Sequence, residues 1–292
     1  MRHIVSLVAL VATSILGVAA IADDAFPVTL QDDRGTSVTI ESRPQRIVAV
    51  AALYAEILVG LGSLDRLVAV AESPDNPPEA SGLPSVGPTY APNVELIIAY
   101  EPDLVLGATD WGGERPALEA VGITVLTTPL LMSVTSILDS IRDVADAVGE
   151  SERGARLIGR IATDIVGAEE AALGLLAVSA AFLYATSTDD PPYTAGSGAI
   201  ENELILRAGG SNVFGDVSGF PQVGFEEILT RDPQVIFTAP SQIENIVGNP
   251  VLQSVSAVAN GRVYGIRASV VSSTRVAEAL RLMIEALHGS DS

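Results

Sequence analysis

The sequence predicts an α/β protein of two similar lobes with mainly parallel sheets, joined by one long rigid α-helix. Three observations lead to this fold class. A short motif occurs twice, in Val94–Gly107 and in Phe225–Thr238. Apolar strand-like runs alternate with helical patterns in both halves of the chain, as in parallel sheets covered on both faces. Between the halves, Glu152–Leu176 keeps a helical pattern for 25 residues, about 37 Å if continuous.

The repeated motif is typical of a helix that stops before a buried strand. In each copy a glutamate near the helix start, Glu95 or Glu226, is followed seven residues later by a proline. Proline cannot continue a helix and biases its predecessor away from helical geometry. An apolar run then follows, Leu104–Leu106 in one copy and Val235–Phe237 in the other. Two copies of one unit favour two lobes, and clefts between lobes commonly hold ligands.

The first 22 residues have the pattern of a secretory signal peptide. Arg2 supplies positive charge, Ile4–Ala20 is almost wholly apolar, and Ala20-Ile21-Ala22 precedes Asp23. The alternative is an uncleaved membrane anchor, but the small residues and the acidic start of the next segment favour removal. Beyond this segment, the expected divisions are an N-terminal lobe over residues 23–130, connecting helices over 131–178 and a C-terminal lobe over 179–292.

In the N-terminal lobe, apolar runs between turn residues predict strands, and longer amphipathic runs predict helices. A turn at Asp33-Arg34-Gly35 closes an expected hairpin. The expected elements in chain order are a hairpin over Phe26–Val38, a strand over Arg46–Ala51, a helix over Leu53–Gly62, a strand over Leu67–Ala71, a Pro- and Gly-rich loop over Glu72–Pro92, the first motif copy, a helix around Arg115–Val121 and a strand over Thr124–Thr128.

Two helical segments follow, Ser133–Gly149 and Glu152–Leu176. In the second, Gly159, Gly167 and Gly174 recur at nearly heptad spacing. Glycine weakens a helix, so this stripe predicts close packing against a neighbour, with a weak, kinked helix as the alternative. We expect this segment to be the connector between the lobes.

The C-terminal lobe repeats the alternation of strands and helices. The expected elements are a strand over Ala180–Ala185, a loop or short strand over Tyr193–Gly196, a helix over Ile200–Ala208, the second motif copy, a helix over Val251–Ala259, a turn at Asn260-Gly261, a strand over Val263–Ile266 and a helix over Ser273–His288.

The composition limits partners and location. The formal net charge is −20, every basic residue is arginine, and no cysteine occurs. Such an acidic surface repels nucleic acid and anionic lipid, so neither is an expected partner. Without cysteine there is neither a disulfide framework nor a lipid-modified cysteine. We therefore expect a freely soluble protein exported to a periplasm, and separately we expect a monomer.

Several enzyme classes are disfavoured. The two histidines are His3, in the leader, and His288, near the C-terminus. A Ser-His-Asp arrangement or a zinc site is therefore not expected, and no phosphate-binding glycine motif occurs, so we expect no cofactor. The remaining alternative is an exported hydrolase or glycan-active enzyme with a carboxylate pair in the cleft. A bare-metal binder is a third reading, disfavoured by the lack of usable histidine.

Aromatic residues in loops are the main candidates for ligand contact in a chain that is only 4% aromatic. Tyr90, Trp111, Tyr193 and Phe220 all lie between expected elements, and loops at strand ends face ligands in open α/β sheets. Their alternative role is to fill the core of their own lobe. Tyr54 lies at a helix start, where it either joins the core or reaches the cleft.

Two arginines and two glutamates complete the candidates. Arg267 and Arg275 flank a stretch after the last strand, where they would neutralise an acidic ligand or pair with a carboxylate of the chain. Glu95 and Glu226 suit the positive end of a helix dipole. Because they occupy matching places in the two motif copies, they also suit docking to arginines of a symmetric partner.

From Asp32 onward, the chain resembles the periplasmic solute-binding proteins of ABC importers for iron chelates and cobalamin. The segments that carry the resemblance are Arg43–Val50, Glu56-Ile57-Leu58 with Gly60-Leu61-Gly62, Pro77-Pro78-Glu79-Ala80 with Leu83–Gly87, Asn93-Val94-Glu95, Glu101–Val105, Tyr193–Gly196, Ala208–Phe214, Phe220–Val223 and Val258–Tyr264.

This resemblance implies two α/β lobes on a rigid helix that close only slightly on ligand. It implies that Glu95 and Glu226 dock onto arginines of a membrane permease dimer, and that Tyr193, Phe220 and Trp111 lie around the cleft. A cleft tryptophan of a cobalamin-binding relative corresponds to Thr89 here, beside Tyr90, which is a departure. Haem-binding relatives use a tyrosine directly after the pair that matches Val86-Gly87, but in this sequence Pro88 follows that pair. The ligand stays open among ferric siderophore, cobalamin and, less favoured, haem.

Overall fold

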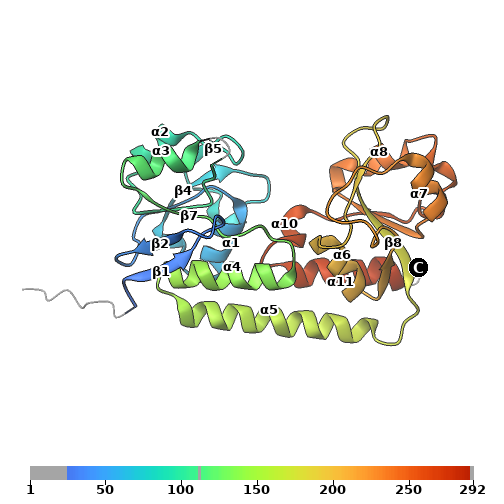
Figure 1. The fold of residues 1–292 in the computed structure, drawn as a ribbon. Helices are drawn as coiled ribbons and strands as arrows, with labels where there is room; N and C mark the ends of the chain where they lie inside the picture. Colours follow the sequence, from blue (N-terminus) through green and yellow to red (C-terminus); the bar gives the residue numbers. More distant parts are fainter. Residues whose placement is uncertain (1–24, 111–112, 290–292) are drawn as a thin grey trace, which may run out of the picture.

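The computed structural model describes residues 25–110 and 113–289, so the expected signal peptide and Trp111 lie outside the described residues. Within that part of the chain, no helix combines the length and the apolar character needed to cross a membrane. Two separate parallel sheets stand above a layer of long helices (Figure 1). The two-lobed α/β fold expected from the sequence is therefore confirmed.

The first sheet contains five parallel strands in the spatial order β5-β4-β3-β6-β7. Alternate residues of its central strands enter two different cores: Ile47 and Ala49 face one, whereas Val48 faces the other. This is why the strands read as short, wholly apolar runs. The bounds are β3 Ile47–Ala49, β4 Leu67–Glu72, β5 Ser85–Pro88, β6 Leu104–Leu106 and β7 Thr124–Leu126, with helices α1 Ala52–Gly60, η1 Leu64–Arg66, η2 Pro78–Ala80, α2 Val94–Ala99 and α3 Glu114–Ala120.

An antiparallel hairpin, β1 (Val28–Gln31) and β2 (Ser37–Ile40), precedes this sheet. The expected turn at Asp33-Arg34-Gly35 is confirmed, with Gly35 in the left-handed region at φ 72°. The hairpin packs beside β7 and α4 (Val134–Ala147) at the outer end of the first lobe (Figure 1).

The second sheet has the parallel order β10-β8-β11-β12, and β9 pairs antiparallel with β8. Strand β11 is fully buried, as its apolar sequence predicts. The bounds are β8 Val178–Tyr184, β9 Tyr193–Thr194, β10 Gly210–Asn212, β11 Val235–Thr238 and β12 Val263–Gly265, with helices α6 Ile200–Arg207, α7 Phe225–Arg231, η3 Pro240–Gln242, α8 Ile243–Val247, η4 Leu252–Ser254, α9 Ser256–Ala259 and α10 Ala268–Val271.

The repeated motif is confirmed as a structural repeat. Each copy forms a short helix and a buried strand, α2 with β6 and α7 with β11. The residue before each motif proline, Glu101 and Asp232, has a positive φ of 48° and 40° respectively. They are the non-glycine residues with positive φ in the described part of the chain. The two copies thus share an unusual backbone turn as well as their helix and strand.

Helix α5, Ser151–Ala172, runs beneath both lobes, with α4 beside its first half and α11 (Val276–His288) beside its second (Figure 1). Its buried residues Leu157, Ile161 and Ile165 recur every four positions and belong to an apolar cluster that also includes residues of α4 and α11. At 22 residues the helix is about 33 Å long. The predicted connector is therefore present, slightly shorter than expected.

The predicted glycine stripe is wrong. A Cβ added at Gly159, Gly167 or Gly174 would meet nothing within 4 Å, and Gly174 lies beyond the helix. The close contact is instead at Gly154, where an added Cβ would stand 2.4 Å from Ala145 Cβ of α4. The three glycines at near-heptad spacing are exposed, and at such positions glycine is tolerated without a packing role.

Exchanging glycine for alanine at Gly154 and at Gly167 is expected to change stability in opposite directions. Gly154→Ala forces α4 and α5 apart and lowers the free energy of unfolding by about 1–3 kcal/mol. Gly167→Ala meets open space and raises it by about 0.5–1 kcal/mol, because the unfolded chain loses freedom. Urea denaturation of both variants checks this; equal effects would contradict the assigned contact.

Four further differences from the sequence expectations are found. The predicted loop over Glu72–Pro92 contains η2 and β5, and β10 was missed altogether. The predicted helix over Val251–Ala259 is broken into η4 and α9. The last helix begins at Val276, after the separate turn of α10.

Candidate ligand-binding cleft

A cavity of about 450 Å³ lies between the lobes. One wall comes from α1 and from Pro74–Glu79, the loop that follows β4. The other wall comes from the segment after β12, with Arg267, Ser269 and Arg275. Both walls thus include chain at the carboxyl ends of parallel strands, where open α/β sheets bind ligands. A second cavity, of about 540 Å³, is lined by residues of the first lobe alone, so we take the shared cavity as the candidate site.

Arg275 joins the two lobes across this cavity. Its Nε donates a hydrogen bond to Glu56 Oε1 at 2.7 Å, and its Nη2 donates to the carbonyl oxygen of Ser269 at 2.8 Å. Thr274 Oγ1 donates to the other carboxylate oxygen of Glu56 at 3.2 Å. Glu56 is 8% exposed, so this ion pair is held in a largely buried position. The structure therefore places Arg275 at the cavity with its charge already paired.

Arg267, the other predicted arginine, lines the same cavity and is exposed. Among the described residues it makes no hydrogen bond or ion pair from its side chain. Asp75 and Glu79 stand in the opposite wall, and in the described part of the chain their carboxylates have no recorded partner either. Within the described part of the chain, the cavity thus carries one unpaired cation on one lobe and two unpaired anions on the other.

Aromatic rings gather at the carboxyl end of β8. Tyr193 stands opposite Tyr184 in the strand register, and a further bridge joins Tyr193 to Gln222. Phe220 packs edge-on against Tyr184, with ring centroids 6.0 Å apart. Tyr193 and Phe220 are 47% and 42% exposed, so both rings remain available for contact. Tyr184 is the member that sequence reasoning missed, because it falls inside a predicted core strand.

A buried carboxyl supports this ring cluster. Tyr184 Oη donates to Glu201 Oε1 at 2.6 Å, and Glu201 Oε2 is buried with no hydrogen-bond partner among the described residues. Burial raises the pKa of Glu201, although the Tyr184 hydrogen bond opposes this, and burial beside Glu201 raises the pKa of Tyr184. The pair fixes the Tyr184 ring beneath Phe220.

Glu201→Gln is expected to flatten the dependence of stability on pH. Because the pKa of Glu201 is higher in the folded than in the unfolded protein, its ionisation costs stability. The cost is absent below the unfolded value, about 4.3, and grows as pH rises through the raised folded value. Because glutamine does not ionise, the variant does not lose this stability. The free energy of unfolding of the variant minus that of the native protein should therefore be larger at pH 8 than at pH 4. Denaturation at both pH values tests it; a constant difference would contradict the assignment.

The structure corrects the candidate role of Tyr54 in the cleft. The residue is 4% exposed, and its Oη contacts Thr128 Oγ1 at 3.2 Å and accepts the Thr128 N–H at 2.9 Å. Its ring lies against Gly107, where an added Cβ would stand 2.5 Å from the ring and φ is 92°. Tyr54 is therefore a core residue of the first lobe, fixed by packing and hydrogen bonds.

Thr89 and Tyr90 follow β5 on the first lobe. Thr89 is half-buried and its Oγ1 donates to the carbonyl oxygen of Glu72 at 3.2 Å, whereas Tyr90 is 94% exposed. Neither lines the shared cavity, and they stay predictions as ligand contacts. Trp111 lies outside the described residues and likewise stays a prediction.

Glu95 and Glu226 occupy matching first-turn positions in α2 and α7, as predicted. Both are exposed, and in the part of the chain that the structure describes neither side chain has a recorded ion pair. Leu96 and Ile98, beside Glu95, are also exposed, at 42% and 37%. The equivalence of these two carboxylates is established, whereas docking stays a proposal.

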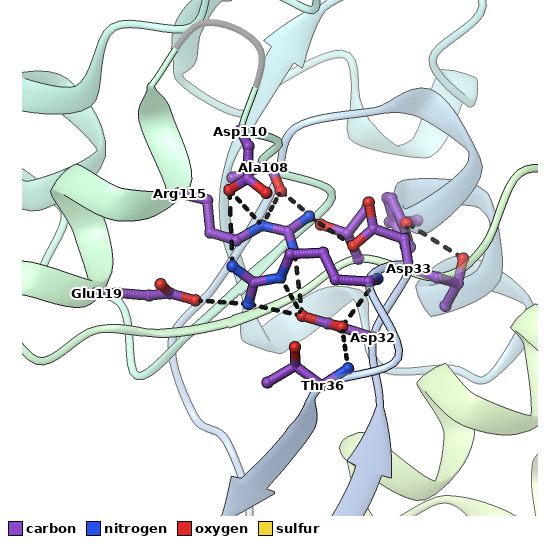
Figure 2. A network of polar contacts seen from close by, with 11 residues as sticks. Asp32, Asp33, Thr36, Ala108, Asp110, Arg115 and Glu119 are labelled. Atoms are coloured by element: carbon purple, nitrogen blue, oxygen red, sulfur yellow. Dashed lines mark hydrogen bonds and ion pairs between the residues drawn. The ribbon is translucent and has the colours of Figure 1, made fainter.

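An ionic network that sequence reasoning missed holds the hairpin to the first lobe (Figure 2). Arg115, 1% exposed, pairs with Asp32 at 3.0 Å and with Asp33 at 2.7 Å. Arg34 also pairs with Asp32, at 2.7 Å, and reaches Glu119 at 3.1 Å. Arg34 and Asp32 are two positions apart, but the other three pairs join residues 82 or more positions apart. No local pattern signals such a pairing.

The same network reaches the end of β6. Arg115 Nε donates to the carbonyl oxygen of Ala108 at 3.2 Å and lies 3.6 Å from Asp110 Oδ1. Thr127 Oγ1 donates to the same carbonyl oxygen at 2.5 Å. The network thereby anchors the chain up to Asp110, at a carboxyl end of the sheet. Residues 25–110 and 113–289 contain no cluster of acidic and histidine side chains suited to a metal ion.

The fold and cleft define a class of protein: a two-lobed binding protein that holds a small ligand between lobes joined by a rigid helix. The chain belongs to the periplasmic binding protein family, whose model matches residues 47–270. It is a substrate-binding protein of transport and not an enzyme, so the alternative of an exported hydrolase is set aside.

Individual relatives agree with this assignment. A vitamin B12-binding protein of Vibrio cholerae is 30% identical over 227 residues, which cover 77% of this chain and 81% of the relative. The apo structure of the periplasmic heme-binding protein RhuT from Roseiflexus sp. RS-1 superposes with a TM-score of 0.77 at 26% identity, covering 84% of this chain and 98% of that one. An ABC-type Fe3+-hydroxamate transport protein from Saccharomonospora viridis gives the same TM-score and identity, covering 90% and 100%.

Proposed function

We propose that this protein captures a metal chelate, a ferric siderophore or cobalamin and less favourably haem, in the cleft between its lobes and delivers it to an ABC permease. The observation that carries the proposal is the cavity that both lobes line, with Arg267 in its wall and without a partner among the residues that the structure describes. The proteins it resembles are named for vitamin B12, Fe3+-hydroxamate and heme, which supports a chelate as the ligand.

Exposed rings that lie outside the lining of the shared cavity are proposed to supply the apolar part of the site. Tyr193 and Phe220 present flat surfaces on the second lobe, and Thr89, Tyr90 and Trp111 are proposed contacts from the first. Flat rings suit a large, partly apolar ligand, which a metal chelate is. Arg267 supplies a directed donor for the polar periphery of the ligand.

Delivery is proposed to use Glu95 and Glu226, one on each lobe. Two exposed carboxylates in equivalent places match a permease dimer that offers an arginine from each subunit. We further propose that the protein is exported by a cleaved signal peptide over residues 1–22 and acts in the periplasm as a monomer. The acidic surface is consistent with a receptor that avoids anionic lipid.

Titration of the purified protein with cyanocobalamin, a ferric trihydroxamate and haemin tests the proposal. All three absorb visible light, and the sole Trp of the chain gives an independent fluorescence signal. We expect saturable binding of at least one of them with one site per chain and no conversion of the ligand. Failure of all three, and of a ferric tricatecholate, to bind would refute the proposed function.

A further inference from the structure

We infer that the cleft selects a chelate without net negative charge, and that Glu56 sets this selectivity by occupying Arg275. The inference rests on the proposed function and names the charge class of its ligand. Three carboxylates, Glu56, Asp75 and Glu79, line the cavity against two guanidinium groups, Arg267 and Arg275. The cavity is therefore not a cationic receptor, although it contains two arginines.

A ligand anion can bind Arg275 only by breaking hydrogen bonds that Arg275 already makes within the chain. Its Nε and Nη2 both donate to acceptors of the chain, Glu56 Oε1 and the carbonyl oxygen of Ser269. Glu56 is 8% exposed, and Thr274 occupies its second oxygen. A ligand that took Arg275 would leave the Glu56 carboxylate largely buried and without its cation, which is strongly unfavourable.

The remaining charges also disfavour an anion. Arg267 is the one cation that lines the cavity and has no partner among the described residues, and it faces the lobe that carries Asp75 and Glu79. A highly anionic chelate would meet two free carboxylates for this single free cation, within a chain of net charge −20.

A neutral chelate with a periphery of amides or hydroxamates avoids this conflict. Its carbonyl oxygens accept hydrogen bonds from Arg267, and its N–H or O–H groups donate to Asp75 and Glu79. The two lobes thus offer opposite hydrogen-bonding roles to one polar, uncharged ligand.

The test compares a neutral ferric trihydroxamate and cyanocobalamin with a trianionic ferric tricatecholate and haemin. The native protein should bind at least one neutral chelate about 10-fold or more tightly than either anionic one. Glu56→Gln leaves the positive charge of Arg275 without its partner. This variant should therefore lower the ratio of neutral-chelate affinity to anionic-chelate affinity by about 10-fold. Adding Arg275→Gln to Glu56→Gln should restore the ratio. Glu170→Gln, the same charge change at an exposed site on α5 outside the cavity, is the matched control.

A second measurement needs no variant. If the cleft repels anions, binding of the trianionic chelate to the native protein should strengthen as NaCl screens the repulsion. Native preference for the anionic chelates, or an unchanged ratio in a Glu56→Gln protein with a normal melting curve, would overturn the inference and leave the proposed function standing. If none of the four chelates binds, the proposed function is refuted, and the inference is refuted with it.

Discussion

Reversing the charges of the two equivalent glutamates on α2 and α7, by Glu95→Arg with Glu226→Arg, is expected to abolish chelate uptake by cells while chelate affinity stays unchanged. Both side chains are exposed and neither lines the cavity between the lobes. Facing permease arginines, each reversed charge turns an attractive pair into a repulsive one, which costs several kcal/mol at an interface. The two together should lower uptake by about 100-fold or more.

Uptake is measured with labelled chelate in cells that carry the matching permease and lack the native copy of this protein. Glu170→Arg with Glu278→Arg is the matched control, because it makes the same net charge change at exposed positions on α5 and α11. The control should transport normally. Lost chelate affinity in the Glu95 and Glu226 variant would contradict a docking role, as would normal uptake.

Arg115→Met is expected to be the most destabilising single change, lowering the free energy of unfolding by about 3–5 kcal/mol. The methionine fills similar space but leaves Asp32, whose side chain is fully buried, with Arg34 alone, and leaves Asp33 without its cation. Urea denaturation measures the loss. Arg142→Met is the control, since its pair with Asp139 is exposed and should contribute about 0–1 kcal/mol.

The same network predicts sensitivity to acid. Burial tends to raise the pKa of Asp32, but the N–H of Thr36 and the guanidinium and N–H of Arg34 hold the pKa below its ordinary value. Its contribution to stability is therefore complete above about pH 4 and is lost as pH falls through the lower folded value. Asp32→Asn should remove this acid-dependent part, and an unchanged slope of stability against pH below 4 would contradict it.

The parts of the fold that could be predicted are those with local signals. A proline after a helix, followed by an apolar run, located both β6 and β11, and their equivalence led to the two lobes. The long amphipathic pattern located α5 to within a few residues at each end. These features depend on backbone chemistry and on burial of one helix face, which the residues themselves carry.

Strands β5 and β10 could not be predicted, because their residues, Ser85–Pro88 and Gly210–Asn212, lack an apolar pattern. They are strands because they lie at sheet edges next to β4 and β8, and such pairing is decided by tertiary contact. Tertiary contact also explains the error at Val251–Ala259, where local propensity predicted one continuous helix and the structure has two short ones.

The candidate site divides in a similar way. Sequence reasoning brought Arg267 and Arg275 to the right place because both follow the last strand. It offered pairing of Arg275 with a carboxylate as an alternative, but it had no means of knowing that this carboxylate is Glu56, 219 residues away. It also placed Tyr54 among the possible ligand contacts, although a helix-start tyrosine beside Gly107 finds its partners in the core.

The apolar core beneath the lobes has a consequence for how the molecule melts. One continuous cluster includes Ile47 of the first sheet, Ile161 of α5 and Phe237 of the second sheet. Each sheet also has a separate core on its other face, but both lobes share this cluster, so each lobe would expose a broad apolar face if separated from the other. Heating should produce a single cooperative endotherm, with equal calorimetric and van't Hoff enthalpies, where a bilobed outline alone suggests two.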